Sequence, residues 1–185
     1  MLCRDQCGKK TALLLAAAGL GLWGIANIAW YITVFAGLRA PVFPSVIDLG
    51  MIASFVVLAL AFQTGFRRDD YSPYLPIAIL LICLLAGAGT MAVLGTSMAT
   101  LFTLCYFLSC GFLFARSIEY GGGQNPALLA GSFLVALAFV IYPLREMFFV
   151  QVVFLSAIGT FVSAGFSLIV IGWIAAGTAG HLHDR

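Results

Sequence analysis

The residues with the clearest chemical potential lie in one short segment, RAPVFPSVID, which interrupts an otherwise apolar chain at residues 39–48. Its two prolines stiffen the backbone and cannot continue a helix. Ser45 is followed three residues later by Asp48, a spacing that resembles a capping box at a helix start. The carboxylate would then lie at the positive end of the helix dipole. The segment therefore predicts a turn and a helix that begins at Val46.

A second polar segment, YPLRE at residues 142–146, carries one basic and one acidic residue. If the helices that bear the two segments pack together, their polar and aromatic side chains would form one cluster, which we call the outer cluster. It would be either a site for a ligand or partner or a salt-bridged clasp, and the sequence does not decide between these. The candidate residues are Arg39, Phe43, Ser45, Asp48, Tyr142, Arg145 and Glu146.

The apolar stretches lack the residue types that catalysis or cofactor binding usually needs. No Lys, His, Asp or Glu falls near the middle of any stretch, and the two histidines, His181 and His183, lie among the last five residues. A haem with histidine ligands, a retinal on a lysine, or an activated serine nucleophile would each need such a group. We therefore expect a protein that is not an enzyme, with no catalytic residues and no cofactor.

The five cysteines do not indicate disulfides or a metal site. Cys83, Cys105 and Cys110 lie inside apolar stretches, where a free cysteine behaves as a small hydrophobic residue. Cys3 and Cys7 form a lone C-x3-C pair without the second half of a zinc site. We expect no bound metal, while reversible acylation of these two cysteines stays an alternative.

Composition places the chain in a membrane. Hydrophobic residues make up 63% and charged residues 9% of the 185 positions, against about 45–50% and roughly 25% in soluble domains. The net charge of +2 does not indicate a nucleic-acid partner. Six stretches reach the roughly 17–25 residues that a spanning helix needs. The predicted spans are 12–38, 46–66, 74–94, 97–115, 126–144 and 148–177.

These spans predict an all-α fold in which residues 1–185 form one integral membrane domain, a polytopic bundle of about six transmembrane helices. The segment between residues 74 and 115 contains no charge, so a helical hairpin and a re-entrant arrangement are both possible there. We favour the hairpin, with its turn at residues 95–97, because the segment is long enough for two spans. Small residues four apart would allow close helix approach: Ala17 with Gly21, Gly159 with Ser163, and Gly172 with Ala176.

The distribution of basic residues predicts the orientation, because Lys and Arg accumulate in short cytoplasmic loops. With both termini in the cytoplasm, only Arg39 and Arg145 of the nine basic residues face outward. The predicted cytoplasmic ones are Arg4, Lys9, Lys10, Arg67, Arg68, Arg116 and Arg185. We therefore predict a multi-pass protein of the cell membrane whose first partner is the lipid bilayer.

Residues 24–62, and above all the PFPSVID sequence within them, resemble the P-F-P-S-x-x-D hairpin of multi-helix membrane sensor regions in bacteria and archaea. Such regions often precede diguanylate-cyclase, phosphodiesterase or histidine-kinase modules. Phe43, Pro44, Ser45 and Asp48 occupy the motif positions. Val46-Ile47 replaces the usual branched-then-Ala pair, and the tyrosine expected shortly after the aspartate is missing.

The resemblance implies a sensor-like module, and the scarcity of catalytic groups agrees with a non-enzymatic role. We expect a sensor-like module or an accessory subunit of a larger membrane complex, with another membrane protein or a second copy of this chain as partner. The alternative is a small transporter or channel, for which Asn27 is the main polar residue within a span. A lipid-directed enzyme is disfavoured because an acid, base or metal cluster is lacking.

Overall fold

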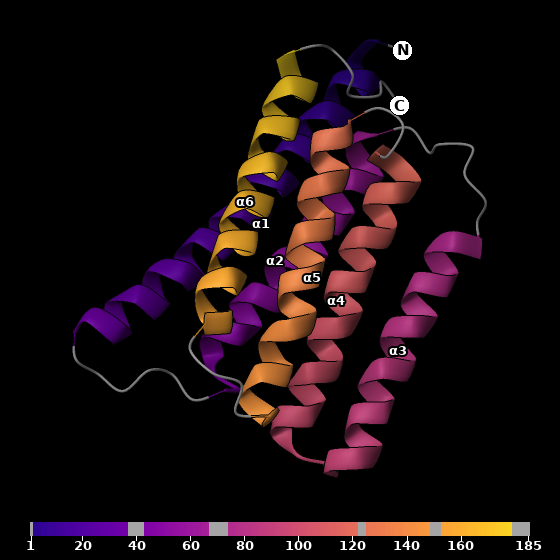
Figure 1. Cartoon of the computed structure of the whole chain (residues 1–185). Helices are drawn as coiled ribbons and strands as arrows, with labels where there is room; N and C mark the ends of the chain where they lie inside the picture. The colour runs from indigo at the N-terminus through magenta and orange to yellow at the C-terminus, as the bar shows by residue number, and fades with distance from the viewer. Residues whose placement is uncertain (1, 37–42, 67–73, 122–124, 149–152, 179–185) are drawn as a thin grey trace.

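A computed structural model describes residues 2–36, 43–66, 74–121, 125–148 and 153–178. Within these ranges the chain forms six α-helices and no strand (Figure 1), so the predicted all-α bundle is confirmed. The helices are α1 (Leu2–Phe35), α2 (Val46–Gly65), α3 (Tyr74–Leu94), α4 (Met98–Gly121), α5 (Pro126–Phe148) and α6 (Val153–Thr178).

The helix bounds follow the predicted spans most closely where local signals delimit them. The predicted spans 46–66 and 74–94 agree with α2 and α3 to within one residue. In contrast, α1 begins ten residues before its predicted span and α4 continues six residues beyond its own. Hydropathy marks the part of a helix that lies in lipid, whereas the hydrogen-bonded helix continues into polar residues outside it.

Five of the helices in the described ranges, α1 to α5, contain a segment long and apolar enough to cross a membrane. In α6 the apolar stretch with described side chains, Phe161–Ala176, is shorter. The structure is therefore compatible with an integral membrane protein that crosses the bilayer several times.

Among the described helices, α4 contacts the largest number of others, and Figure 1 shows it between α3 and α5. It packs against α2, α3 and α5, while α1 packs mainly on α2 and α6 mainly on α5. Tyr106, Cys110 and Leu113 of α4 are fully buried, at the spacing of one helix face. Figure 1 shows successive helices running antiparallel, so that the start of α1 and the end of α6 lie at the same end of the bundle.

The predicted hairpin between α3 and α4 is present. Gly95, at the turn, has a φ of +80°, a left-handed conformation that favours glycine. Ser97 and Thr100 then begin α4 with reciprocal bonds: the Ser97 N–H donates to Thr100 Oγ1 over 2.9 Å, and the Thr100 N–H donates to Ser97 Oγ over 3.2 Å. The chain thus reverses direction through bonds within six residues.

Glycines bring α5 and α6 into close contact. A Cβ atom on Gly131 would lie 2.6 Å from the carbonyl oxygen of Gly165, and one on Gly165 would lie 2.9 Å from that of Gly131. Asn125 also donates from Nδ2 to the carbonyl oxygen of Gly172 over 2.9 Å. Of the glycines predicted at helix contacts, Gly172 lies against Leu128 of α5, whereas a Cβ on Gly21 would meet nothing within 4 Å.

Aromatic rings connect the helices through the middle of the bundle. The ring centroid of Phe55 in α2 lies 4.8 Å from that of Phe139 in α5 and 6.2 Å from that of Phe166 in α6. Phe166 in turn stacks on Trp23 of α1, with 4.0 Å between centroids. These four rings join elements that are distant in the sequence.

Candidate functional site

The segment of residues 43–48, which we call the elbow, leads into α2 as predicted. Ser45 is the N-cap residue of α2, and the helix begins at Val46. Both the N–H and the hydroxyl of Ser45 donate to Asp48 Oδ2, each over 2.7 Å. The Asp48 carboxylate therefore accepts a free donor of the first turn, as in a capping box, and lies at the positive end of the helix dipole.

The second oxygen of Asp48 makes a bond that reaches far along the chain. The hydroxyl of Tyr106 in α4 donates to Asp48 Oδ1 over 2.7 Å, a bond between residues 58 positions apart. Asp48 is only 4% exposed and Tyr106 is fully buried. A buried carboxylate is costly unless hydrogen bonds satisfy it, and Asp48 receives three from Ser45 and Tyr106 together. We call this bond between α2 and α4 the Asp48–Tyr106 link.

Aromatic rings enclose the link. Phe43 of the elbow lies with its ring centroid 6.1 Å from that of Tyr106 and 6.0 Å from that of Tyr142 in α5. On its other side Tyr106 stacks on Phe139, with 5.5 Å between centroids and 13° between planes. Phe102 approaches Phe43 edge-on. The rings keep water from the carboxylate and strengthen its hydrogen bonds.

Asp48 lies further along the bundle than the start of α4, although Val46 of the elbow is 83% exposed. Eight residues separate Met98, where α4 begins, from Tyr106, a rise of roughly 12 Å along the helix. Asp48 must reach that depth to meet the tyrosine hydroxyl. Figure 1 shows the same relation, since α2 begins further into the bundle than the turn between α3 and α4.

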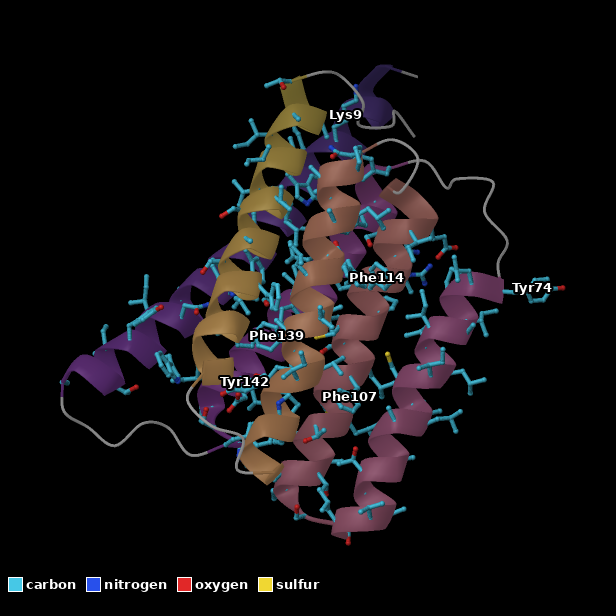
Figure 2. The ribbon with its side chains drawn as sticks, in the orientation of Figure 1. Lys9, Tyr74, Phe107, Phe114, Phe139 and Tyr142 are labelled. Carbon is cyan, nitrogen blue, oxygen red and sulfur yellow. The ribbon has the colours of Figure 1, made fainter. Side chains whose placement is uncertain are left out.

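The structure brings together four of the seven predicted residues of the outer cluster. Phe43, Ser45 and Asp48 lie in the elbow. Tyr142, which Figure 2 labels on α5, contacts Phe43 and Tyr106. Arg39 lies outside the described residues. Arg145 and Glu146 are part of α5, one turn beyond Tyr142, but their side chains also lie outside what the structure describes. The proposed ion pairs of the cluster stay predictions.

Sequence reasoning missed the residue that completes the site, Tyr106. A signal was available, because a hydroxyl within an apolar span needs a hydrogen-bond partner. Its partner could not be named, since the stretch TLCYFLSC places Thr103, Tyr106 and Ser109 at three-residue spacing but does not show which helix that face meets. Phe102 and Phe139 were missed for a related reason, as each is one phenylalanine among sixteen.

The chemistry of the link is that of a clasp between helices. Both carboxylate oxygens of Asp48 are engaged by donors, Oδ2 by Ser45 and Oδ1 by Tyr106. Among the described side chains, no three His, Cys, Asp or Glu residues lie together as a metal site would require.

The opposite end of the bundle carries a local ion pair instead. Arg116 and Glu119, three residues apart on α4, form a salt bridge, and the Arg116 guanidinium lies 5.1 Å from the ring centroid of Phe112. A second aromatic group, Phe62, Phe66 and Trp173, packs α2 against α6 at this end. The contacts of Arg116 with Glu119 and with Phe112 both lie within α4.

The cysteines of the described region are free thiols. Cys110 is fully buried in α4, and Cys83 of α3 packs against Gly111, as expected of small hydrophobic residues. Cys105 is exposed on the surface of the bundle. The side chains of Cys3 and Cys7 lie outside the described set.

No protein-family model, curated protein or solved structure matches this chain.

Proposed function

We propose that this chain is a non-enzymatic integral membrane protein, a sensor-like module or an accessory subunit of a larger membrane complex. In this role a ligand or partner binds the elbow on the outer face. The resulting displacement of the elbow reaches α4 through the Asp48–Tyr106 link. The observation that carries the proposal is this link, because it joins the start of α2 to the helix that contacts the largest number of others.

The position of α4 supports such a role. A displacement of the elbow would break or redirect the hydrogen bond to Tyr106, and α4 contacts α2, α3 and α5. Packed interfaces respond to small shifts by moving between discrete arrangements. A ligand or partner that binds the elbow differently in two such arrangements would shift their populations. The resemblance of the elbow to the sensor hairpin motif agrees with this proposal.

The use of polar groups also supports a non-enzymatic role. The carboxylate that most resembles a catalytic group, Asp48, serves its own helix start and one tyrosine. Asn27, the main polar residue within a predicted span, donates to the carbonyl oxygen of Trp23 in the same helix over 2.9 Å. It also approaches the Met51 sulfur at 3.9 Å. In a transporter, a polar group in a span would face the solute site. The Asn27 amide instead bonds within the protein.

Purification in mild detergent tests the proposal. We expect a second membrane protein to copurify in fixed stoichiometry, measured by native mass spectrometry. Tyr106→Phe should lower its yield several-fold, because the variant removes the link and keeps the ring. Thr100→Ala, on the same helix but bonded only locally, is the matched control and should keep the partner. A homo-oligomer that a solute stabilises would instead favour the transporter, and an unchanged complex with Tyr106→Phe would contradict the role of the link.

The proposed orientation has its own test. Reporter fusions after Arg68, Gly122 and Arg185 should report the cytoplasm, and fusions near Pro44 and Glu146 should report the outside. An odd number of crossings between the termini would contradict the topology, and with it the placement of the elbow on the outer face.

A further inference from the structure

A continuous series of aromatic rings leads from the Asp48–Tyr106 link to α6 and α1. We call this series the aromatic path. Its members in order are Tyr106 of α4, Phe139 of α5, Phe55 of α2, Phe166 of α6 and Trp23 of α1. The centroids of successive rings lie 5.5, 4.8, 6.2 and 4.0 Å apart, the distances of rings in contact.

Phe55 joins the two parts of the aromatic path. Its ring centroid lies 4.8 Å from that of Phe139 and 6.5 Å from that of Tyr106, and it also contacts Phe166. Phe55, Tyr106 and Phe166 are almost completely buried. Protein interiors are close-packed, so a buried ring shifts only if the rings that it contacts shift as well. A displacement of Tyr106 would therefore reach Phe166 through Phe55.

The last contact of the aromatic path joins two helices that otherwise meet little. Among the described residues, the contact of α1 with α6 is the least extensive between any two helices that touch, and Figure 1 shows the later part of α1 leaning away from α6. The Trp23 indole N–H is buried and has no hydrogen-bond partner in the described part of the chain. Ring contact, without a hydrogen bond from the indole, therefore holds Trp23 against Phe166. We call this stack the joint.

We propose that the joint between α1 and α6 opens when the elbow is displaced, and that the aromatic path carries the displacement from Tyr106 to Trp23. Packed interfaces respond to small shifts by moving between discrete arrangements, and the least extensive interface yields first. Phe55 is then a positioning residue that acts on the joint through Phe166. This inference rests on the proposed function, because a ligand or partner at the elbow supplies the displacement.

Trp23 itself provides the measurement. The chain has three tryptophans, so a full-length chain with Trp30→Phe and Trp173→Phe keeps Trp23 alone. In bilayers of phosphatidylcholine with brominated acyl chains, bromine quenches an indole that contacts lipid, and the quenched fraction of the emission reports the open joint. Tyr106→Phe removes the link and should raise the ratio of open to stacked joints about fivefold, the lower end of the usual coupling between distant sites. Thr100→Ala, bonded only locally, should leave this ratio unchanged.

Two phenylalanines of α2 separate the aromatic path from a general loss of packing. Phe55→Leu keeps an apolar side chain and removes the ring, so adding Tyr106→Phe should change the ratio less than twofold, within the response that the loss of the path leaves. Phe62→Leu is the matched control, because Phe62 is equally buried on the same helix but lies outside the aromatic path. It should preserve the full response. Phe166→Leu removes the ring on which Trp23 stacks and gives the quenched fraction of the open joint directly.

The outcomes distinguish this inference from the proposed function. If Tyr106→Phe releases the copurified partner but leaves the quenched fraction unchanged, the joint is overturned and the proposed function stands. If the quenched fraction rises but no partner copurifies, the joint stands and the proposed function is contradicted. A response that survives Phe55→Leu, or that Phe62→Leu also removes, would overturn the aromatic path. Should Phe55→Leu fail to fold, equal quenching in Phe166→Leu and the parent chain would overturn the joint.

Discussion

Two helix starts at the same end of the bundle use the same local device and differ in what they reach. At the start of α2, Ser45 and Asp48 are joined by hydrogen bonds three residues apart, and at the start of α4, Ser97 and Thr100 are joined in the same way. Both helices thereby satisfy backbone N–H groups that a helix leaves without partners. By local sequence alone, the two starts are equivalent.

The two helix starts differ in the residue that is bonded outside the capping pair. Asp48 uses its remaining oxygen to bind Tyr106 across the bundle, whereas the further hydrogen bonds of Thr100 go to the carbonyl oxygens of Ser97 and Gly95. The extent of burial does not explain this difference in partners, since Asp48 is 4% and Thr100 2% exposed. The chemical nature of the side chain explains it, because a buried carboxylate needs more hydrogen-bond donors than a buried hydroxyl. A capping motif marks a candidate site only where it also reaches another element.

The largest expected effect comes from removing the carboxylate. Asp48→Ala should lower the free energy of unfolding by about 3 kcal/mol, because the start of α2 loses its cap and the buried Tyr106 hydroxyl loses its acceptor. Unfolding in a titration with dodecyl sulfate measures this. Asp48→Asn keeps an acceptor oxygen and should cost less. If Asp48→Ala costs no more than a cap on an isolated helix, the elbow is only a turn.

The next effect isolates the long-range bond. Tyr106→Phe keeps the ring that stacks on Phe139 and removes the hydroxyl, at a cost of about 2 kcal/mol because one oxygen of a buried carboxylate loses its donor. A double-mutant cycle with Asp48→Asn should give a coupling of about 0.5–3 kcal/mol. A cycle of Tyr106→Phe with Thr100→Ala should be additive, because the Thr100 hydroxyl bonds within residues 95–100 and the Tyr106 hydroxyl bonds to Asp48. Additivity in both cycles would contradict the link.

A smaller effect is expected at the turn before α4. Gly95→Ala should cost about 1–2 kcal/mol, because a residue with a Cβ is strained at a φ of +80°. A Cβ at this position meets nothing within 4 Å, so packing does not contribute. Gly89→Ala is the matched control, since it has the same open space but lies within α3. There alanine favours the helix by up to about 1 kcal/mol, so a loss at Gly89 would contradict the explanation by strain.

The smallest effect is expected for the reciprocal bond at the start of α4. Thr100→Ala should cost about 1 kcal/mol, the usual net value of a hydrogen bond, because it removes the acceptor of the Ser97 N–H and keeps the Ser97 hydroxyl that caps the helix. It should leave the proximity of Phe43 and Tyr142 unchanged, which cross-linking of cysteines placed at these two positions can measure. If Thr100→Ala lowers the free energy of unfolding more than Asp48→Ala does, the comparison is reversed. The turn before α4, and not the elbow, would then contribute most to the stability of the end of the bundle where α2 and α4 begin.

The sequence predicted most where the determining interactions are local. The start of α2 at Val46 followed from the Ser45–Asp48 spacing, and the hairpin near Gly95 followed from the length of an uncharged segment. The first span was predicted at 12–38, and the apolar segment of α1 lies at Lys9–Thr33 within a helix that begins at Leu2, because hydropathy does not detect a helix that continues into polar residues. Phe43 and Tyr142 were grouped correctly from topology, since both were expected on one face of the membrane.

By itself, then, the sequence determined the apolar segments and the cap that begins α2, because these depend on residues a few positions apart and on transfer into lipid. Only the tertiary structure decided that Tyr106 meets Asp48 and that Gly19 faces Leu58. Such contacts depend on how each helix is rotated about its axis. In a soluble protein an apolar stripe reveals that rotation. Here lipid and core are equally apolar, so an apolar stripe does not mark the buried face, although on α4 the polar residues Thr103, Tyr106 and Ser109 recur on the buried side.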